Sequence, residues 1–161
     1  MSNIAPCLWF DDRIEEAVNF YVSVFPNSKI LSKSAYDDAG PMEKGKVMVM
    51  TFELDGVEFM GLNGGPKFKF TEAVSFLVKC ETQAEVDRYW NTLIADGGAE
   101  SMCGWLKDRF GLSWQIVPNA LGRLMGDKDK EKANRVMQAM LKMRKIDVAE
   151  LQRAYDGKAA A

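Results

Sequence analysis

Apolar and polar residues follow one another in this chain with two periods, one typical of helices and one typical of strands. The first half opens with an apolar run at residues 4–10. Apolar residues then recur at helical spacing over residues 14–25, and Pro26 ends that pattern because proline cannot continue a helix. A hairpin signal at Asp55-Gly56 joins two later apolar runs. Strands are predicted at residues 4–10, 29–36, 47–54 and 57–62.

The second half repeats this order after a chain break at Asn63-Gly64-Gly65-Pro66. Its helix begins with a capping box at Thr82 to Glu85, carries apolar residues on one face up to Ile94, and ends at Gly97-Gly98. A capping box of the same spacing, Asp12 to Glu15, precedes the first helix. Strands are predicted at residues 73–80 and 100–106 and in a hairpin over residues 104–118. Each half of the chain therefore predicts one β-α-β-β-β unit.

After Pro118 the pattern is helical only. Ile146 and Leu151 flank a third capping box, Asp147 to Glu150, in the positions of a hydrophobic staple. Helices are predicted at residues 119–126, from Asp127 or Asp129 to Leu141, and from Asp147 to Tyr155. Their methionine-rich face needs a partner, and we expect it to pack on the domain or on a second subunit. As an alternative, this face makes the tail an interaction module.

The repeated units place this chain in the α+β class, with two βαβββ repeats whose helices lie outside the sheets. We predict one domain at residues 1–120, with repeat one at 3–65 and repeat two at 66–120. A C-terminal helical extension follows at residues 121–161.

Composition narrows the range of partners. The chain has 161 residues with 47% apolar content, which predicts one domain with a sizeable core. The net charge of -2 and the scattered basic residues give no reason to expect nucleic acid or a membrane as partner. No apolar run approaches the roughly 20 residues of a membrane span, so we expect a cytoplasmic protein. Cys7, Cys80 and Cys103 lack C-x-x-C spacing, and we expect reduced thiols.

Residues 108–115 contain the pattern D-x-x-G-x-x-W-Q, which resembles the last hairpin of the glyoxalase, bleomycin-resistance and dioxygenase (vicinal oxygen chelate) superfamily. Residues 62–76 and 103–118 resemble its PhnB-like branch, whose members often carry the name 3-demethylubiquinone-9 3-methyltransferase. The resemblance covers residues 4–118. It implies a curved mixed sheet, built from two βαβββ repeats, with a central cleft.

Many members of this superfamily hold one divalent ion with four inward side chains, commonly His, Glu or Gln. Carried over position by position, the resemblance gives these four positions to Ala5, Met60, Ser75 and Gln115. A methyl group offers no donor atom, a thioether is too soft for magnesium or zinc, and a hydroxyl and a neutral amide are weak ligands. The chain also has no histidine. We therefore expect neither a metal nor another cofactor.

The residues predicted to line the cleft and bind a ligand are Trp9, Met60, Phe68, Phe70, Ser75 and Gln115. Ser75 and Gln115 would orient a small, flat, mostly apolar molecule through hydrogen bonds. The predicted function is that of a metal-free small-molecule-binding protein that forms a homodimer. In the competing interpretation, Trp9, Trp105 and Trp114 simply fill the core between sheet and helix.

An alternative function is that of an enzyme of this superfamily that acts on a small organic substrate, and no catalytic residue is assigned. The glycine-rich stretch at residues 61–65 does not favour methyl transfer. It ends a hairpin strand and precedes Pro66, whereas a nucleotide-like cofactor is usually held at a helix N-terminus.

Overall fold

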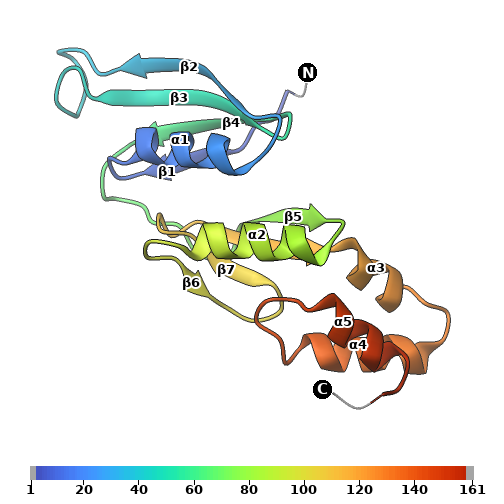
Figure 1. Cartoon of the computed structure of the whole chain (residues 1–161). Helices are drawn as coiled ribbons and strands as arrows, with labels where there is room; N and C mark the ends of the chain where they lie inside the picture. The colour runs from blue at the N-terminus through green and yellow to red at the C-terminus, as the bar shows by residue number, and fades with distance from the viewer. Residues whose placement is uncertain (1–2, 159–161) are drawn as a thin grey trace. The chain divides into compact units, whose positions relative to one another are not determined.

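The computed structural model describes residues 3–158 and separates into two compact units, residues 1–70 and 71–161 (Figure 1). Each unit contains one four-stranded mixed sheet and a helix that follows the first strand of that sheet. The chain thus has an α+β fold with two βαβββ repeats, as its sequence predicts. The predicted central cleft depends on how the units are arranged and stays a prediction.

The first unit has its strands in the order β1-β4-β3-β2, with β1 parallel to β4 and the other neighbours antiparallel. Its elements are β1 (Cys7–Phe10), α1 (Ile14–Val24), β2 (Lys29–Ala35), β3 (Val47–Leu54) and β4 (Val57–Asn63). Figure 1 shows α1 across one face of this sheet. The alternation over residues 50–54 of β3 and 59–63 of β4 explains the packing, because every second residue there is buried on the side of α1. The opposite face of the sheet carries no helix of this unit.

The start of α1 differs from the prediction. Asp12 does not cap this helix, which has Arg13 at its N-cap position and no side-chain cap hydrogen bond from that residue. Instead, the backbone N–H of Ile14 donates to Oδ1 of Asn63 over 3.0 Å. Asn63 is buried, and its Nδ2 donates to the carbonyl of Val47 over 2.9 Å. A residue from the last strand of the repeat therefore satisfies the helix terminus that a local cap was expected to satisfy.

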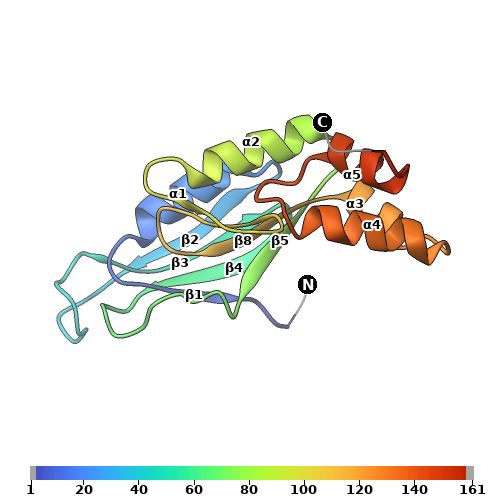
Figure 2. The same ribbon diagram turned by 90° about the horizontal axis from the view of Figure 1, so that it is seen from below.

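The second unit repeats the topology, with the strand order β5-β8-β7-β6 and β5 parallel to β8. Its elements are β5 (Ser75–Cys80), α2 (Gln83–Ile94), β6 (Ala99–Glu100), β7 (Trp105–Lys107), β8 (Ser113–Pro118), α3 (Asn119–Met125), α4 (Lys130–Met140) and α5 (Val148–Tyr155). Figure 2 shows α2 along one face of β5 and β8. The predicted capping box of α2 is confirmed at Thr82, whose hydroxyl accepts the N–H of Glu85 over 3.2 Å.

The strand predicted at residues 100–106 is divided in two. Cys103 and Gly104 take positive φ values of 59° and 83°, which turn the chain out of the extended conformation between β6 and β7. Their backbone N–H groups donate to the carbonyls of Met143 and Arg144 over 2.7 and 2.8 Å. The tail thus provides hydrogen-bond acceptors for this turn, and such distant partners leave no local sequence signal.

The hairpin between β7 and β8 is held by Asp108. This carboxylate is buried and accepts the backbone N–H groups of Phe110 and Leu112 through Oδ1, over 2.8 and 3.0 Å. Its Oδ2 accepts the indole N–H of Trp114 over 2.9 Å. Gly111 has φ 86°, a conformation that favours glycine. The pattern D-x-x-G-x-x-W therefore stabilises the hairpin. Trp114 is buried, which confirms its predicted core position.

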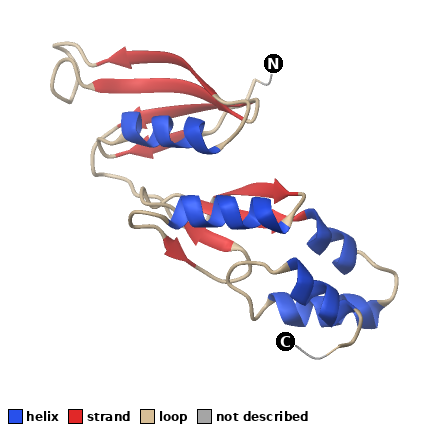
Figure 3. Cartoon of the chain, in the orientation of Figure 1, coloured by secondary structure: helices blue, strands red, loops and turns tan. Residues whose placement is uncertain are grey.

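The C-terminal helices form a small core of their own (Figure 3). The buried members of this core are Leu121, Val136, Ile146 and Leu151. Asp129 caps α4 by accepting the N–H groups of Glu131 and Lys132, and Asp147 caps α5 by accepting the N–H of Glu150. Both caps and the staple positions agree with the prediction. Within residues 3–158, no helix is long and apolar enough to cross a membrane.

Candidate functional site

The helix-free face of the second sheet brings together two predicted site residues, Ser75 and Gln115. Nε2 of Gln115 donates a hydrogen bond to Oγ of Ser75 over 2.9 Å. Ser75 begins β5 and Gln115 lies in the neighbouring parallel strand β8, two residues beyond the position directly opposite Ser75. Their side chains share a face because residues two apart in a strand point the same way. Both are partly exposed, so the pair is accessible.

Two further side chains flank this pair. In the strand register Gln115 lies between Leu77 of β5 and Trp105 of β7. Leu77 is 50% exposed and Trp105 is half-buried. The sequence interpretation that placed Trp105 in the core between sheet and helix is wrong, because its register puts it on the face opposite α2. Leu77 was missed, although its alternation with Ser75 along β5 was a usable signal.

A small cavity of about 230 Å³ lies beside this pair and is lined in part by Trp105, Lys107 and Ser113. The hydroxyl of Ser113 is buried and has no hydrogen-bond partner within residues 3–158. Lys107 forms an ion pair with Glu72 at the edge of the cavity, and the hydrogen bond from Lys107 lowers the pKa of that carboxyl group. The cavity therefore combines an aromatic wall, a buried hydroxyl and an ion pair.

On the first sheet, the helix-free face carries Trp9. Its ring packs edge-on against Phe68, with the ring centroids 5.0 Å apart, and its indole N–H donates to the carbonyl of Gly65 over 2.8 Å. Gly64 is required here, since a Cβ at this position would lie 2.3 Å from the indole ring. Phe68 remains 55% exposed. The loop after β4 thus fixes the indole and presents an apolar ring beside it.

Met60 is on the same face as Trp9, and Phe70 is not part of this group. Met60 is 38% exposed and lies opposite Cys7 in the register of β1 and β4. The ring of Phe70 packs on Phe10, with the centroids 5.2 Å apart, and Phe10 alternates with Trp9 and faces α1. From the sequence, both Phe68 and Phe70 are predicted to line the cleft. No strand forms at that point of the chain, so strand alternation does not apply.

The four positions that the resemblance assigned to metal ligands carry side chains that do not suit a divalent ion. In the first unit these positions fall on Ala5, which precedes β1, and on Met60. In the second unit they fall on Ser75 and Gln115, whose amide group donates to the Ser75 hydroxyl. A methyl group, a thioether, a hydroxyl and a neutral amide make a poor ligand set for magnesium, manganese or zinc. Among residues 3–158 there is also no group of three His, Cys, Asp or Glu side chains placed to hold a metal.

Two of the three thiols have a raised pKa. Burial raises the pKa of Cys80 to about 11, and partial burial raises the pKa of Cys7. A thiol with such a pKa is almost entirely protonated at neutral pH and is a poor nucleophile. The arrangement around Gln115 is therefore suited to binding through hydrogen bonds and apolar contact.

The comparison with protein families matches residues 2–117 to the 3-demethylubiquinone-9 3-methyltransferase family. Among solved structures, the chain is 40% identical to a putative 3-demethylubiquinone-9 3-methyltransferase, PhnB protein, from Bacillus cereus. The alignment covers 73% of this chain and 99% of that one, with a TM-score of 0.67. The search of the curated proteins found no match.

Two more distant structures share the fold alone. Protein PA1353 from Pseudomonas aeruginosa is 22% identical, with 73% of this chain and 98% of that chain covered and a TM-score of 0.62. The fosfomycin resistance protein FosX from Listeria monocytogenes is 14% identical, with 74% and 93% covered and a TM-score of 0.52. With most of the chain matched by the family and two βαβββ repeats in place, this chain belongs to the 3-demethylubiquinone-9 3-methyltransferase (PhnB-like) family.

Proposed function

We propose that this chain binds a small, flat, mostly apolar organic molecule on the helix-free face of its second sheet. The observation that carries the proposal is the partly exposed amide of Gln115, held by Ser75 and flanked by Leu77 and Trp105. Such a surface offers apolar contact on both sides of a fixed polar group, which is how small-molecule sites combine affinity with orientation. The neighbouring cavity at Ser113 adds space and a buried hydroxyl.

The first sheet offers a surface of the same chemical kind. Trp9, Phe68 and Met60 place two aromatic rings and a thioether on its helix-free face. Methionine adapts its shape to irregular apolar partners, so these residues suit the same class of ligand. They form a second candidate surface, on the first unit alone, which leaves out Phe70 because its ring packs on Phe10.

The proposal favours binding without a metal. The four side chains at the positions of the metal ligands include no carboxylate and no imidazole. They are therefore poorly suited to hold an ion that would polarise vicinal oxygens of a substrate. An enzyme that acts on the bound molecule without a metal is the second candidate. The name of the family makes demethylated quinones and related phenols the first compounds to test. A homodimer in the cytoplasm is part of the proposal, and sedimentation analysis tests the dimer.

Thermal denaturation in the presence of aromatic, phenolic and quinone compounds tests the function. A ligand that binds only the folded chain raises the melting temperature with concentration, as mass action requires. The rise should persist in excess EDTA and should be largely lost in Gln115→Leu. Gln152→Leu changes an exposed amide on α5 and serves as the matched control. Mass spectrometry of the compound after incubation separates a binder from an enzyme. If Gln115→Leu keeps the full shift for every compound that stabilises the parent, the proposed site is wrong.

A further inference from the structure

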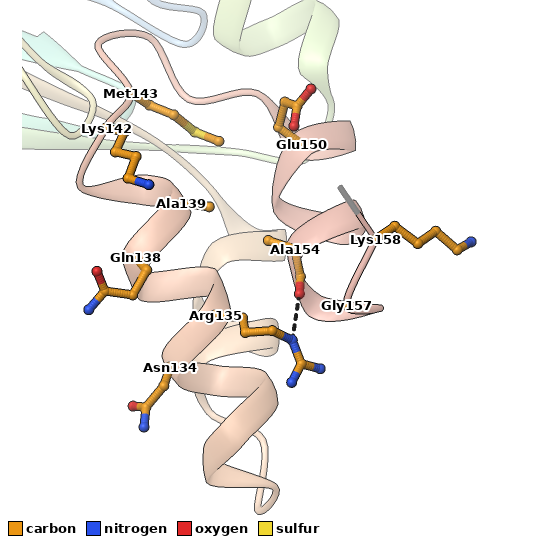
Figure 4. A pocket seen from close by; sticks show the side chains of 10 residues that line it. All are labelled: Asn134, Arg135, Gln138, Ala139, Lys142, Met143, Glu150, Ala154, Gly157 and Lys158. Atoms are coloured by element: carbon orange, nitrogen blue, oxygen red, sulfur yellow. Dashed lines mark hydrogen bonds between the residues drawn. The ribbon is translucent and has the colours of Figure 1, made fainter. Parts of the chain in front are cut away.

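A second surface that could receive a partner lies on the C-terminal helices, in a part of the chain beyond the family match at residues 2–117. Helices α4 and α5 enclose an open groove with a volume of about 640 Å³ (Figure 4). Its lining begins on α4 at Asn134 and continues past the end of that helix to Met143. On the other side it begins on α5 at Glu150 and continues past the end of that helix to Lys158. At the helical rise of 1.5 Å per residue, the part of the wall on α4 is roughly 8 Å long, enough for about two residues of extended chain.

The groove carries positive charge that its own side chains do not neutralise. The guanidinium of Arg135 donates to the carbonyls of Ala154 and Tyr155 over 2.9 and 2.7 Å, and it has no carboxylate partner among residues 3–158. Lys142 is exposed and likewise forms no ion pair within the described chain. Lys158 pairs with Asp156 over 3.7 Å. The groove is thus positive although the whole chain has a net charge of -2.

The remaining lining is apolar or neutral. Ala139, Met143 and Ala154 line the groove with aliphatic and thioether groups, and Asn134 and Gln138 add amides that form no hydrogen bond within residues 3–158. The one carboxylate of the lining, Glu150, is already paired with Arg153. A partner that matches this surface needs negative charge together with at least one apolar side chain.

We propose that the groove between α4 and α5 binds an acidic peptide segment of a partner protein. Carboxylates of the segment face Lys142, Lys158 and Arg135, and an apolar side chain packs on Ala139 and Met143. A groove of about 640 Å³ is larger than a compact ion needs and has room for a short peptide segment. Nucleic acid is a poorer match, because its phosphate backbone calls for a longer run of cations than the three found here. This proposal concerns a surface separate from that of Gln115 and does not depend on it.

Fluorescence anisotropy with a short fluorescein-labelled peptide of alternating glutamate and leucine tests the proposal on the full chain. Peptides with glutamine or lysine in place of glutamate are the comparison probes. The double variant Lys142→Glu, Lys158→Glu should bind the acidic peptide at least about tenfold more weakly, since each reversal turns an attraction into a repulsion. The double variant Lys128→Glu, Lys130→Glu makes the same change of charge at two exposed positions outside the groove and should bind like the parent. Arg135 is left intact because it also holds the end of α5.

The expected result is binding of the glutamate peptide alone, weakened by salt and by the double variant. Circular dichroism should show unchanged helix content in both variants. The proposal is overturned if the glutamate peptide does not bind, if the glutamine peptide binds equally well, or if the double variant binds like the parent. Binding of vesicles containing phosphatidylserine in place of the peptide would overturn it in favour of a membrane surface.

Discussion

The side-chain amide of Gln115 donates to the hydroxyl of Ser75 over 2.9 Å, across two parallel strands and on a face without a helix. The two residues are 40 positions apart in the sequence. Both are partly exposed, so their hydrogen-bonding capacity is not used up by the fold. The hydroxyl can still donate, and the amide oxygen can still accept.

This pair predicts that Ser75→Ala weakens ligand binding more than it weakens folding. Loss of a partly exposed hydrogen bond should lower the free energy of unfolding by no more than about 1 kcal/mol. Binding should weaken by a larger factor, because the freed amide loses its fixed orientation. Urea unfolding and thermal shifts with the compounds found in the screen measure the two effects. Ser23→Ala removes an exposed hydroxyl on α1 and is the control. If Ser75→Ala lowers the free energy of unfolding and the free energy of ligand binding by the same amount, the pair has a purely structural role.

Asp108 is predicted to be a strong determinant of stability. Asp108→Ala leaves the indole N–H of Trp114 and two backbone N–H groups without their acceptor in a buried place. The free energy of unfolding should fall by about 3 kcal/mol or more, as expected for several orphaned donors. Urea denaturation measures this change. Asp38→Ala, at an exposed loop position, should change it by less than about 0.5 kcal/mol. A small effect of Asp108→Ala would mean that water replaces the carboxylate.

The start of α1 gives a paired prediction. Asn63→Ala should lower the free energy of unfolding by about 2 kcal/mol, because it removes the acceptor of the Ile14 N–H and the donor to Val47 in a buried site. Asp12→Ala should have almost no effect, since Asp12 makes no cap hydrogen bond. The same urea titration compares the two variants. If Asp12→Ala proves the more harmful, the capping box operates in solution.

Acid should loosen the attachment of the tail to the second sheet. The hydrogen bond from Lys145 lowers the pKa of Asp87 below its ordinary value of 3.8. The indole of Trp90, together with Arg144, lowers the pKa of Glu100 below 4.5. Because both values are lower in the folded state, their contribution to stability is complete above these ordinary values and is lost as pH falls through the folded pKa values. The melting temperature should therefore hold near neutral pH and fall below about pH 4.

A matched variant checks the origin of this acid effect. In Asp87→Asn the side chain no longer titrates, so the melting temperature should be lower at neutral pH and should fall less steeply in acid. Identical acid profiles for parent and variant would show that other carboxylates cause the transition.

The sequence predicted well wherever the relevant contacts are local. The caps of α2 and α5 and the hairpin at Asp108 depend on partners within six residues, and each formed as expected. The family resemblance gave Ser75 and Gln115 two positions of one site, and in the structure their side chains form a hydrogen bond. The competing interpretation, which placed Trp105 in the core between sheet and helix, does not hold, because the register of β7 puts this residue on the same face as Gln115. The strand containing it is short and interrupted, so parity could not be counted from its neighbours.

By itself, the sequence determined two βαβββ repeats and a helical tail, because hydrophobic periods and capping residues act over a few positions of the chain. Tertiary structure decided which distant group completes each local element. Asn63 satisfies the start of α1, the carbonyls of Met143 and Arg144 divide the strand before β7, and Phe70 packs on Phe10 and not beside Phe68. These partners lie far apart in the chain, and a backbone N–H can donate to any suitably placed oxygen. The residues next to each N–H in the sequence therefore do not indicate which oxygen will accept its hydrogen bond.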